Sequence, residues 1–378
     1  MINHSLKNIK KQTGNNTVLF VAIGLIAILV GFFVQTGSNK PTAFPEFGKM
    51  IIFPTAKPIK HNSFTDHQGQ TFNEAQLKGK WSILFFGFTN CPDICPSTLQ
   101  TLKQVKQQLE KQSLWQNYQV VMVSVDPDTD TTERLSNYVP FFDSEFIGIV
   151  DDVDATMAFA KQMGILFIKR AASDNSRLAY DVDHSASMVL LNPEGQWAGV
   201  IGAPHKADEI SADLAKLAKF VGPVPIIKKA AQQTTQINKK TPEARENKAE
   251  NYPADAPPLV IESAWIRPAP PNVTSLAAYF EIINTSDNDI TIVDSSSPAF
   301  DATMIHNTVI ENGVARMEHM DGLTIPAKGS VLLAPLSTHM MLMRPETPLR
   351  AGDTVSITLV DEDDNEYDYQ VSVRTQPE

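Results

Sequence analysis

Residues 223–257 divide the chain, because they hold almost no large apolar side chain after Ile227. Lys, Gln, Ala, Asn and Thr dominate this stretch, and prolines punctuate it. Such a composition cannot bury enough surface to fold, so we predict a flexible linker. The length of 378 residues fits a domain on each side of it.

The charge balance argues against a nucleic-acid partner. Lys and Arg total 32 against 43 Asp and Glu, which gives a formal net charge of −11. This charge repels phosphate backbones, and no basic run alternates with aromatic residues. A composition that is 42% hydrophobic and 20% charged is typical of a globular protein.

The N-terminal part of the chain predicts a membrane anchor. Residues 17–34 carry no charge, and at ~1.5 Å per helical residue they approach the ~30 Å thickness of the hydrocarbon layer. Lysines precede this segment, so the positive-inside rule places residues 1–16 in the cytoplasm and the rest outside. A cleaved signal peptide is the alternative. We expect an uncleaved single-pass helix, followed by a stalk over 35–57.

Strand and helix patterns alternate between residues 58 and 222. Short, continuous apolar runs predict buried strands at 81–88, 119–125 and 187–192. Apolar residues at helical spacing predict helices at 97–112, 132–142, 155–163 and 207–220. This alternation predicts an α/β domain with helices on the faces of a sheet.

The pattern of apolar and polar residues changes again between residues 258 and 375. Short alternating segments predict strands at 277–283, 307–310, 315–319, 330–334, 354–359 and 367–374. No helical pattern accompanies them. We therefore predict an all-β sandwich or barrel.

The chain has only two cysteines, Cys91 and Cys95, in the sequence Cys-Pro-Asp-Ile-Cys-Pro between a predicted strand and a predicted helix. A helix N-terminus favours the thiolate form. A structural disulfide, a redox-active dithiol and a soft-metal site are the three interpretations. The metal interpretation gains from an imidazole, and His184 just before a predicted core strand is the candidate.

Four motifs occur in an order that identifies a family. They are Gly87-Phe-Thr-Asn-Cys-Pro-Asp-Ile-Cys-Pro96, Val123-Ser-Val-Asp-Pro127 with Asp130, Tyr138-Val-Pro-Phe-Phe142 and Val182-Asp-His-Ser-Ala-Ser187. Together they resemble the Sco/SenC family of membrane-anchored, thioredoxin-like copper proteins over residues 58–222. Asn90 stands where that family often has His, which is not one of its ligands.

The resemblance implies that Cys91, Cys95 and His184 bind one copper ion, as Cu(I) or Cu(II). It also implies a place in the bacterial inner membrane, with both domains in the periplasm. The implied acceptor is the CuA subunit of cytochrome c oxidase. The alternative is a thiol–disulfide oxidoreductase that reduces the cysteines of the CuA site before metallation, served by a thioredoxin-like reductant.

Residues 304–343 hold six of the 12 methionines and three of the eight histidines. Asn312-Gly313 predicts a two-residue hairpin, which would place His306 opposite His319 and Thr308 opposite Met317. His339, Met341 and Met343 alternate along a further strand, so they point to one side. Thioether and imidazole ligands suit Cu(I).

The spacing of His306, Met317, His339 and Met341 resembles that of the PCuAC family of periplasmic domains over residues 258–375. The resemblance implies a cupredoxin-like β fold in which these four residues bind Cu(I). Three neighbours fall outside the motif, and we expect them to pack around it: Met304, His319 and Met343. Leu336-Ser-Thr338 replaces a Gly-rich approach to the third ligand, which predicts altered flexibility of that loop.

Two other groups have plainer interpretations. Asp126 and Asp130 flank a predicted turn, and we expect a structural or docking role for them. His205 precedes a helix and is expected at the surface or near a helix cap. The combined prediction is a copper metallochaperone with two tethered copper domains, whose linkage raises the effective concentration of one site near the other.

Overall fold

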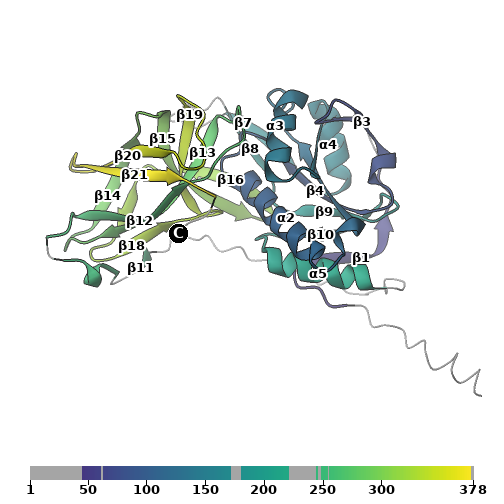
Figure 1. The fold of residues 1–378 in the computed structure, drawn as a ribbon, viewed down its shortest axis with the longest axis horizontal. Coiled ribbons are helices and arrows are strands. Elements are labelled where there is room, and N and C mark those ends of the chain that lie inside the picture. Colours follow the sequence, from purple (N-terminus) through teal and green to yellow (C-terminus); the bar gives the residue numbers. More distant parts are fainter. Residues whose placement is uncertain are drawn as a thin grey trace, which may run out of the picture.

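The computed structural model describes residues 45–60, 63–171, 180–220, 244–245, 248–253 and 255–375. These residues form an α/β domain and a β domain that lie side by side along the long axis of the molecule (Figure 1). The predicted anchor at 17–34 lies outside them. Within the described ranges, no helix combines the length and the apolar character needed to cross a membrane.

The first domain is built on an eight-stranded sheet. Its strands are, in spatial order, β1 (Met50–Lys57), β10 (Trp197–Ile201), β9 (Met188–Leu191), β4 (Trp81–Gly87), β5 (Tyr118–Ser124), β6 (Ile147–Val150), β2 (Phe64–Asp66) and β3 (Thr71–Phe72). The neighbours β4, β5 and β6 run parallel. The apolar runs of β4 and β5 occupy the centre because both faces there are covered.

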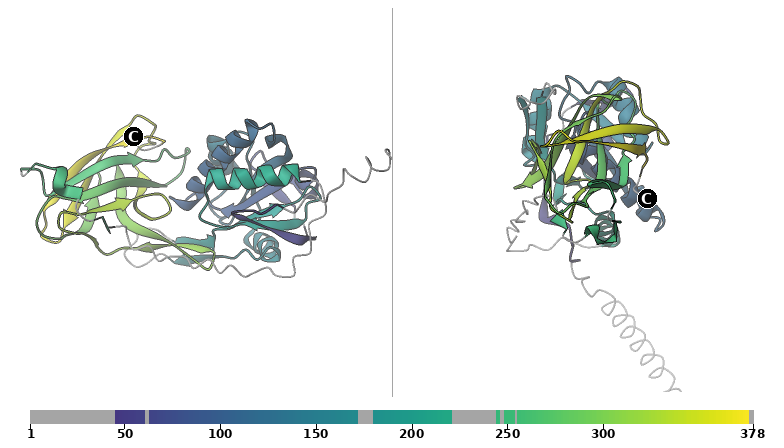
Figure 2. Two further views of the ribbon diagram at one scale, coloured as in Figure 1. Left: turned by 90° about the horizontal axis from the view of Figure 1, so that it is seen from below. Right: turned by 90° about the vertical axis from the view of Figure 1, so that its left-hand side faces the viewer.

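Four α-helices cover the two faces of this sheet (Figure 2). They are α2 (Ile94–Glu110), α3 (Thr132–Phe142), α4 (Val153–Gln162) and α5 (Ala207–Lys219), with short 3-10 turns η1 (Glu74–Leu77) and η2 (Trp115–Asn117). The predicted helices and the α/β class are confirmed. Helix α2 begins earlier than predicted because Pro96 fits a first helical turn, where its missing N–H loses no hydrogen bond.

The second domain is a β-sandwich, as predicted. Its strands are β12 (Leu259–Ile266), β13 (Ser275–Asn284), β14 (Ile290–Ser296), β15 (Phe300–Glu311), β16 (Val314–His319), β17 (Leu323–Ile325), β18 (Ser330–Leu333), β19 (Thr338–Pro345), β20 (Thr354–Asp361) and β21 (Glu366–Val373). Alternate side chains of these strands form a separate apolar core that includes Phe280, Ile305 and Ile357. The strand order places β13, β19, β15 and β16 side by side.

A hairpin from the first half of the chain joins the sheet of the second domain. It consists of β7 (Phe167–Ala171) and β8 (Tyr180–Ser185). Strand β8 pairs antiparallel with β16, so that Ser185 lies opposite Val314 and His184 opposite Ala315. One sheet therefore runs from the second domain into the first, which brings His184 close to the hairpin that carries Met317.

Part of the predicted linker is attached to the second domain. Strand β11 (Ala244–Arg245) pairs with β18, and the 3-10 turn η3 (Lys248–Asn251) follows it. The Lys248 ammonium lies 3.0 Å from the Glu262 carboxylate and also contacts Glu281. Backbone pairing and ion pairs, not apolar contacts, hold these residues on the second domain. The composition of the segment, which is poor in apolar side chains, therefore did not predict this attachment.

Asp213 on α5 binds the backbone at the start of the first domain to the last helix of that domain. Its buried carboxylate accepts the backbone N–H groups of Gly48 (3.0 Å), Lys49 (2.7 Å) and Met50 (3.1 Å). We expect Asp213→Ala to lower the free energy of unfolding by about 3 kcal/mol, because these donors lose their acceptor. Denaturant titration would measure this effect. Asp208→Ala on the same helix is the matched control, because the Asp208 carboxylate accepts only an exposed hydrogen bond from Gln108 (2.7 Å). Equal effects of the two substitutions would contradict the prediction.

Candidate metal centres

The three residues predicted for the first copper site come together at the junction of the domains. Cys91 lies in the loop after β4, Cys95 in the first turn of α2, and His184 on β8. Their sulfur and imidazole nitrogen atoms all lie within 4.8 Å of one another. In the part of the chain that the structure describes, no other group of three His, Cys, Asp or Glu side chains is arranged to hold a metal ion.

The contacts of His184 orient one ring nitrogen toward the sulfur atoms of Cys91 and Cys95. Its Nε2 lies 3.7 Å from Cys95 Sγ, and its Nδ1 lies 3.1 Å from the carbonyl oxygen of Ser185. When Nδ1–H donates to this carbonyl, the lone pair of Nε2 faces the cysteines, as in metal-ligating histidines. Both cysteines are free thiols, so the structural disulfide considered above is not present.

The two thiols differ in acidity. Burial raises the pKa of Cys91, but hydrogen bonds from Cys95 and His184 and the charge of His184 outweigh it and hold the pKa well below its usual range. Burial and the neighbouring Cys91 sulfur raise the pKa of Cys95 well above that range. Cys91 is therefore the more acidic of the two thiols.

Asp130 supports the loop that leads to the cysteines. Its carboxylate accepts hydrogen bonds from the backbone N–H of Thr89 (3.1 Å) and from the hydroxyl of Ser124 (2.7 Å). Burial raises the pKa of Asp130 to about 6, although these hydrogen bonds lower it. Asp126 instead forms an ion pair with Lys169 at 3.0 Å. These contacts give both aspartates the structural role expected from the sequence.

The four residues predicted for the second site lie on one face of the second domain. Strand β15 places His306 between His319 on β16 and His339 on β19, and the predicted pairing of Thr308 with Met317 is confirmed. Met341 is paired with Met304 two positions away. Because paired residues project from the same side of a sheet, these side chains form one surface, which we call the His/Met face.

The imidazoles of the His/Met face have nitrogen atoms available for a ligand. Within the described residues, Nδ1 of His306, Nδ1 of His319 and Nε2 of His339 are buried and make no hydrogen bond. Burial, together with the nearby imidazoles of His339 and His319, lowers the pKa of His306 to about 3. Neutral imidazoles with thioether sulfur atoms suit Cu(I) and do not suit hard cations.

The three neighbours outside the motif differ from one another. Met343 Sδ accepts a hydrogen bond from Ser275 at 3.4 Å, which fits the packing role expected for it. Met304 packs against Met341 and Met343. His319 stands closer to the site than expected, because its ring centre lies 5.4 Å from that of His306, whereas His339 lies 6.3 Å away.

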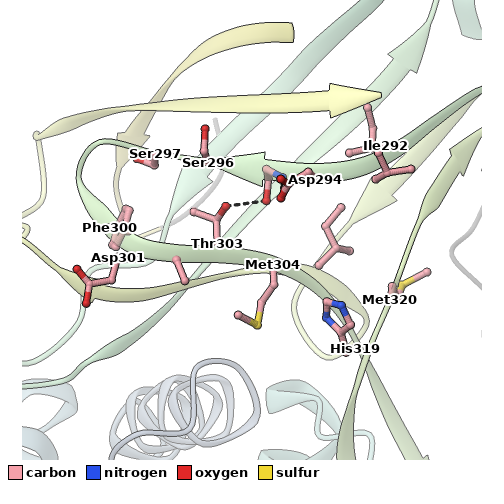
Figure 3. A pocket seen from close by; sticks show the side chains of 14 residues that line it. Ile292, Asp294, Ser296, Ser297, Phe300, Asp301, Thr303, Met304, His319 and Met320 are labelled. Atoms are coloured by element: carbon pink, nitrogen blue, oxygen red, sulfur yellow. Dashed lines mark hydrogen bonds between the residues drawn. The ribbon is translucent and has the colours of Figure 1, made fainter. Parts of the chain in front are cut away.

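A cavity of about 510 Å³ opens beside strands β14 and β15. Met304 and His319 line its edge, and the hydroxyls of Ser295 and Thr303 form a hydrogen bond of 2.6 Å across it (Figure 3). The cavity therefore borders one end of the His/Met face. Cys91, Cys95 and His184 do not line it.

Comparisons with known proteins separate the two domains in the same way. Residues 55–219 match the family model described as SCO1/SenC, and residues 259–373 match the one described as "Putative lipoprotein LpqE-like". A "Putative copper-binding protein" of Stutzerimonas stutzeri is 33% identical over 168 residues, which cover 44% of this chain and 80% of that protein. The chain belongs to the SCO1/SenC family.

Other SCO1/SenC relatives include mitochondrial SCO1 and SCO2 homologues, of whose length this chain spans about half. The copper-bound ScoI of Arabidopsis thaliana is 30% identical and covers 42% of this chain and 98% of its own, with a TM-score of 0.39. The copper-bound PCuAC domain of PmoF2 is 21% identical and covers 31% of this chain and 93% of its own, with a TM-score of 0.27. The two family matches confirm the predicted fusion of a thioredoxin-like SCO1/SenC domain with a second domain.

Asp93 lies between the two cysteines, and no local pattern in the sequence predicts a role for it. Its side chain contacts Tyr279 and Thr308 of the second domain, more than 180 positions along the chain. Leu336 of the second domain lies beside Asp93. Its backbone takes a left-handed conformation (φ 63°), and its N–H donates to Asp93 at 2.8 Å. No local pattern could reveal contacts over such separations.

Proposed function

We propose that this protein is a copper metallochaperone with two copper sites. Cys91, Cys95 and His184 bind copper as Cu(I) or Cu(II), and His306, Met317, His339 and Met341 bind Cu(I). The protein is anchored in the inner membrane by residues 17–34, works in the periplasm, and loads the CuA centre of cytochrome c oxidase. The observation that carries the proposal is the convergence of two buried sulfur atoms and an imidazole within 4.8 Å.

The chemistry of both donor sets supports copper. Two sulfur ligands stabilise Cu(I), and an added imidazole lets the same site hold Cu(II). The His/Met face keeps its ligands in an oxidising compartment, where exposed thiols would be lost. Relatives of the first domain include a protein named for copper binding and a structure with copper bound.

We further propose that copper passes between the two sites by ligand exchange. His339 Nδ1 lies 3.8 Å from a carboxylate oxygen of Asp93, the residue between the two cysteines. In this step, bonds from Cu(I) to imidazole and thioether break, and bonds to the sulfur atoms of Cys91 and Cys95 form. Any thiol proton leaves to solvent, and the oxidation state of copper does not change.

Anaerobic Cu(I) stoichiometry of the reduced full-length chain in detergent tests the proposal. We expect two tightly bound copper ions in the wild type, and one each in Cys91→Ser/Cys95→Ser and in His306→Ala/Met317→Ala. Met320→Leu is the matched control, because Met320 packs toward the apolar core of the second domain, and it should keep two. The absence of tight copper in the wild type would overturn the proposal.

A thiol–disulfide oxidoreductase is the second candidate, and the unequal acidity of the cysteines favours it. Attack by a thiolate begins such an exchange, and Cys91 is the more acidic thiol. In that reaction two electrons pass from the dithiol to a disulfide of the CuA site, and a thioredoxin-like reductant restores the pair. Copper binding and exchange use the same sulfur atoms, so a variant that separates them is needed.

A further inference from the structure

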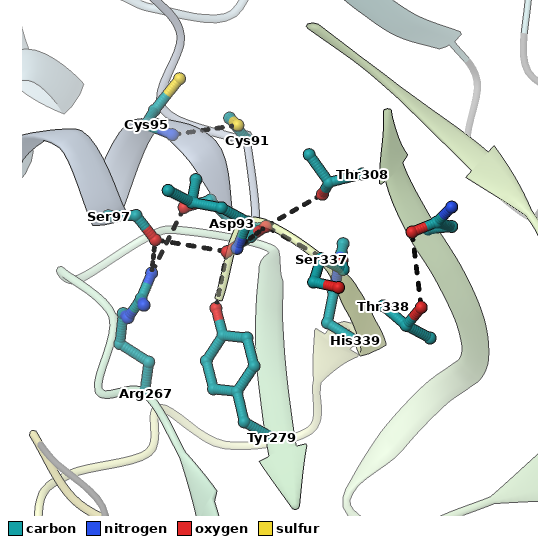
Figure 4. A network of polar contacts seen from close by, with 12 residues as sticks. Cys91, Asp93, Cys95, Ser97, Arg267, Tyr279, Thr308, Ser337, Thr338 and His339 are labelled. Atoms are coloured by element: carbon teal, nitrogen blue, oxygen red, sulfur yellow. Dashed lines mark hydrogen bonds and ion pairs between the residues drawn. The ribbon is translucent and has the colours of Figure 1, made fainter. Parts of the chain in front are cut away.

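Asp93 is the centre of a polar network that joins the two domains (Figure 4). Its carboxylate is fully buried. It accepts hydrogen bonds from three donors of the second domain: the hydroxyl of Tyr279 (3.0 Å), the hydroxyl of Thr308 (3.0 Å) and the backbone N–H of Leu336 (2.8 Å). A fourth, longer hydrogen bond comes from the Ser97 hydroxyl on α2 (3.3 Å). Asp93 precedes the first residue of α2, yet its side chain makes no capping bond to that helix. A residue type suited to capping its own helix is thus used to hold the other domain.

Further contacts surround this network on both sides of the cysteine loop. The Arg267 guanidinium donates to the Ser97 hydroxyl at 2.9 Å and to the Asp93 carbonyl at 3.3 Å. The Thr274 hydroxyl donates to the side-chain oxygen of Asn90 at 2.9 Å. Residues before, between and after the two cysteines (Asn90, Asp93 and Ser97) are therefore all bound to the second domain.

Apolar contacts complete the interface. Val273 and Ala315 of the second domain are buried in the core of the first, and Ile310 and Leu336 pack against that core. The pairing of β8 with β16 adds backbone hydrogen bonds beside His184. In this arrangement Cys91 and His184 are each only 2% exposed, and Cys95 is not exposed at all.

We propose that the second domain is an intrachain lid on the cysteine–histidine site, with Asp93 as the positioning residue of the closed state. In the closed chain the lid presents its His/Met face to the cysteine loop. An external acceptor, or any other reagent for the thiols, reaches them only when the contacts of Asp93 open. The proposal deepens the chaperone function, but the closing of the lid does not itself require copper.

Alkylation of Cys91 and Cys95 in the metal-free, reduced full-length chain tests the lid. We compare Tyr279→Phe, which removes one donor to Asp93, with Tyr369→Phe. The Tyr369 hydroxyl also donates one hydrogen bond, at 2.9 Å to the Leu259 carbonyl, but this bond stays within the second domain. Iodoacetamide is the probe, and the measured quantity is the rate constant of thiol loss.

We expect Tyr279→Phe to be alkylated about ten-fold faster than the wild type, the factor expected when a hydrogen bond to a charged group is lost. Thr308→Val should give a similar increase, and Tyr369→Phe should match the wild type. Thermal unfolding of the three variants identifies one that has lost its fold. If either Tyr279→Phe or Thr308→Val has unfolded, the alkylation rate of the other variant tests the lid.

Two outcomes would overturn the lid. One is equal alkylation rates in the wild type and in folded Tyr279→Phe and Thr308→Val. The other is wild-type thiols that react as fast as they do in denaturant. Because no copper is present, these outcomes are independent of the stoichiometry experiment, and a chain could keep both coppers while failing this test.

Discussion

His184→Ala is expected to weaken Cu(I) binding at the cysteine site more than 100-fold. Loss of a residue that only supports a ligand typically costs 10–100-fold in metal affinity, and loss of one of three direct ligands should exceed it. The neighbouring thiols remain, so thiol–disulfide exchange should survive, at a lower rate because His184 no longer lowers the pKa of Cys91. The measurement is competition with a chromophoric Cu(I) chelator in the His306→Ala/Met317→Ala background, where only the first site reports.

His205→Ala is the control for this variant, because His205 lies in the loop before α5 and outside both sites. It should leave copper affinity and exchange unchanged. Wild-type copper affinity in His184→Ala would show that His184 is not a ligand. If exchange were lost while copper stayed bound, the oxidoreductase would replace the chaperone as the leading function.

Gly87→Ala is expected to disrupt the same site without removing a ligand. A Cβ atom at Gly87, at the end of β4, would lie 2.8 Å from Cys95 Sγ and 2.5 Å from the ring of Phe85. Such contacts are too close, so the sulfur atom and the ring must move. We expect copper affinity to fall at least ten-fold and the free energy of unfolding to fall by about 2 kcal/mol, as for other overpacked cores.

Gly202→Ala is the matched control, because no heavy atom lies within 4 Å of the Cβ position there. Chelator competition and denaturant titration on both variants separate the effect on the site from the effect of losing a glycine. Equal copper affinity in Gly87→Ala and Gly202→Ala would mean that the position of Cys95 Sγ is not critical for binding.

Local signals in the sequence predicted those parts of the structure that local chemistry decides. Helix α3 begins at the predicted residue because the Thr131 hydroxyl accepts a hydrogen bond from the Arg134 N–H at 3.2 Å. Asn312 and Gly313 both have positive φ angles, as a two-residue hairpin turn requires. That turn fixed the register of β15 and β16, and with it the shared face of His306 and Met317.

The junction between the domains could not be predicted in this way. Asp93 has the appearance of a helix cap in the sequence, but three of its hydrogen-bond donors, Tyr279, Thr308 and Leu336, belong to a domain encoded much later. No local signal places Leu336 at the interface, where its N–H donates to Asp93 and its side chain packs against the core of the first domain. No local sequence signal predicts the pairing of β8 with β16 either, because the sequence of each strand is equally compatible with an unpaired edge strand.

The pairing of β8 with β16 also affects how separate chains behave toward one another. Each of these strands, once parted, offers a row of unsatisfied N–H and C=O groups, which is a template for pairing with another chain. The complementary strand is present in every copy, so two opened molecules can satisfy both rows by reciprocal exchange. Attachment to a membrane would concentrate such molecules in a plane. There, an intact pairing of β8 with β16 would prevent strand exchange between neighbouring chains.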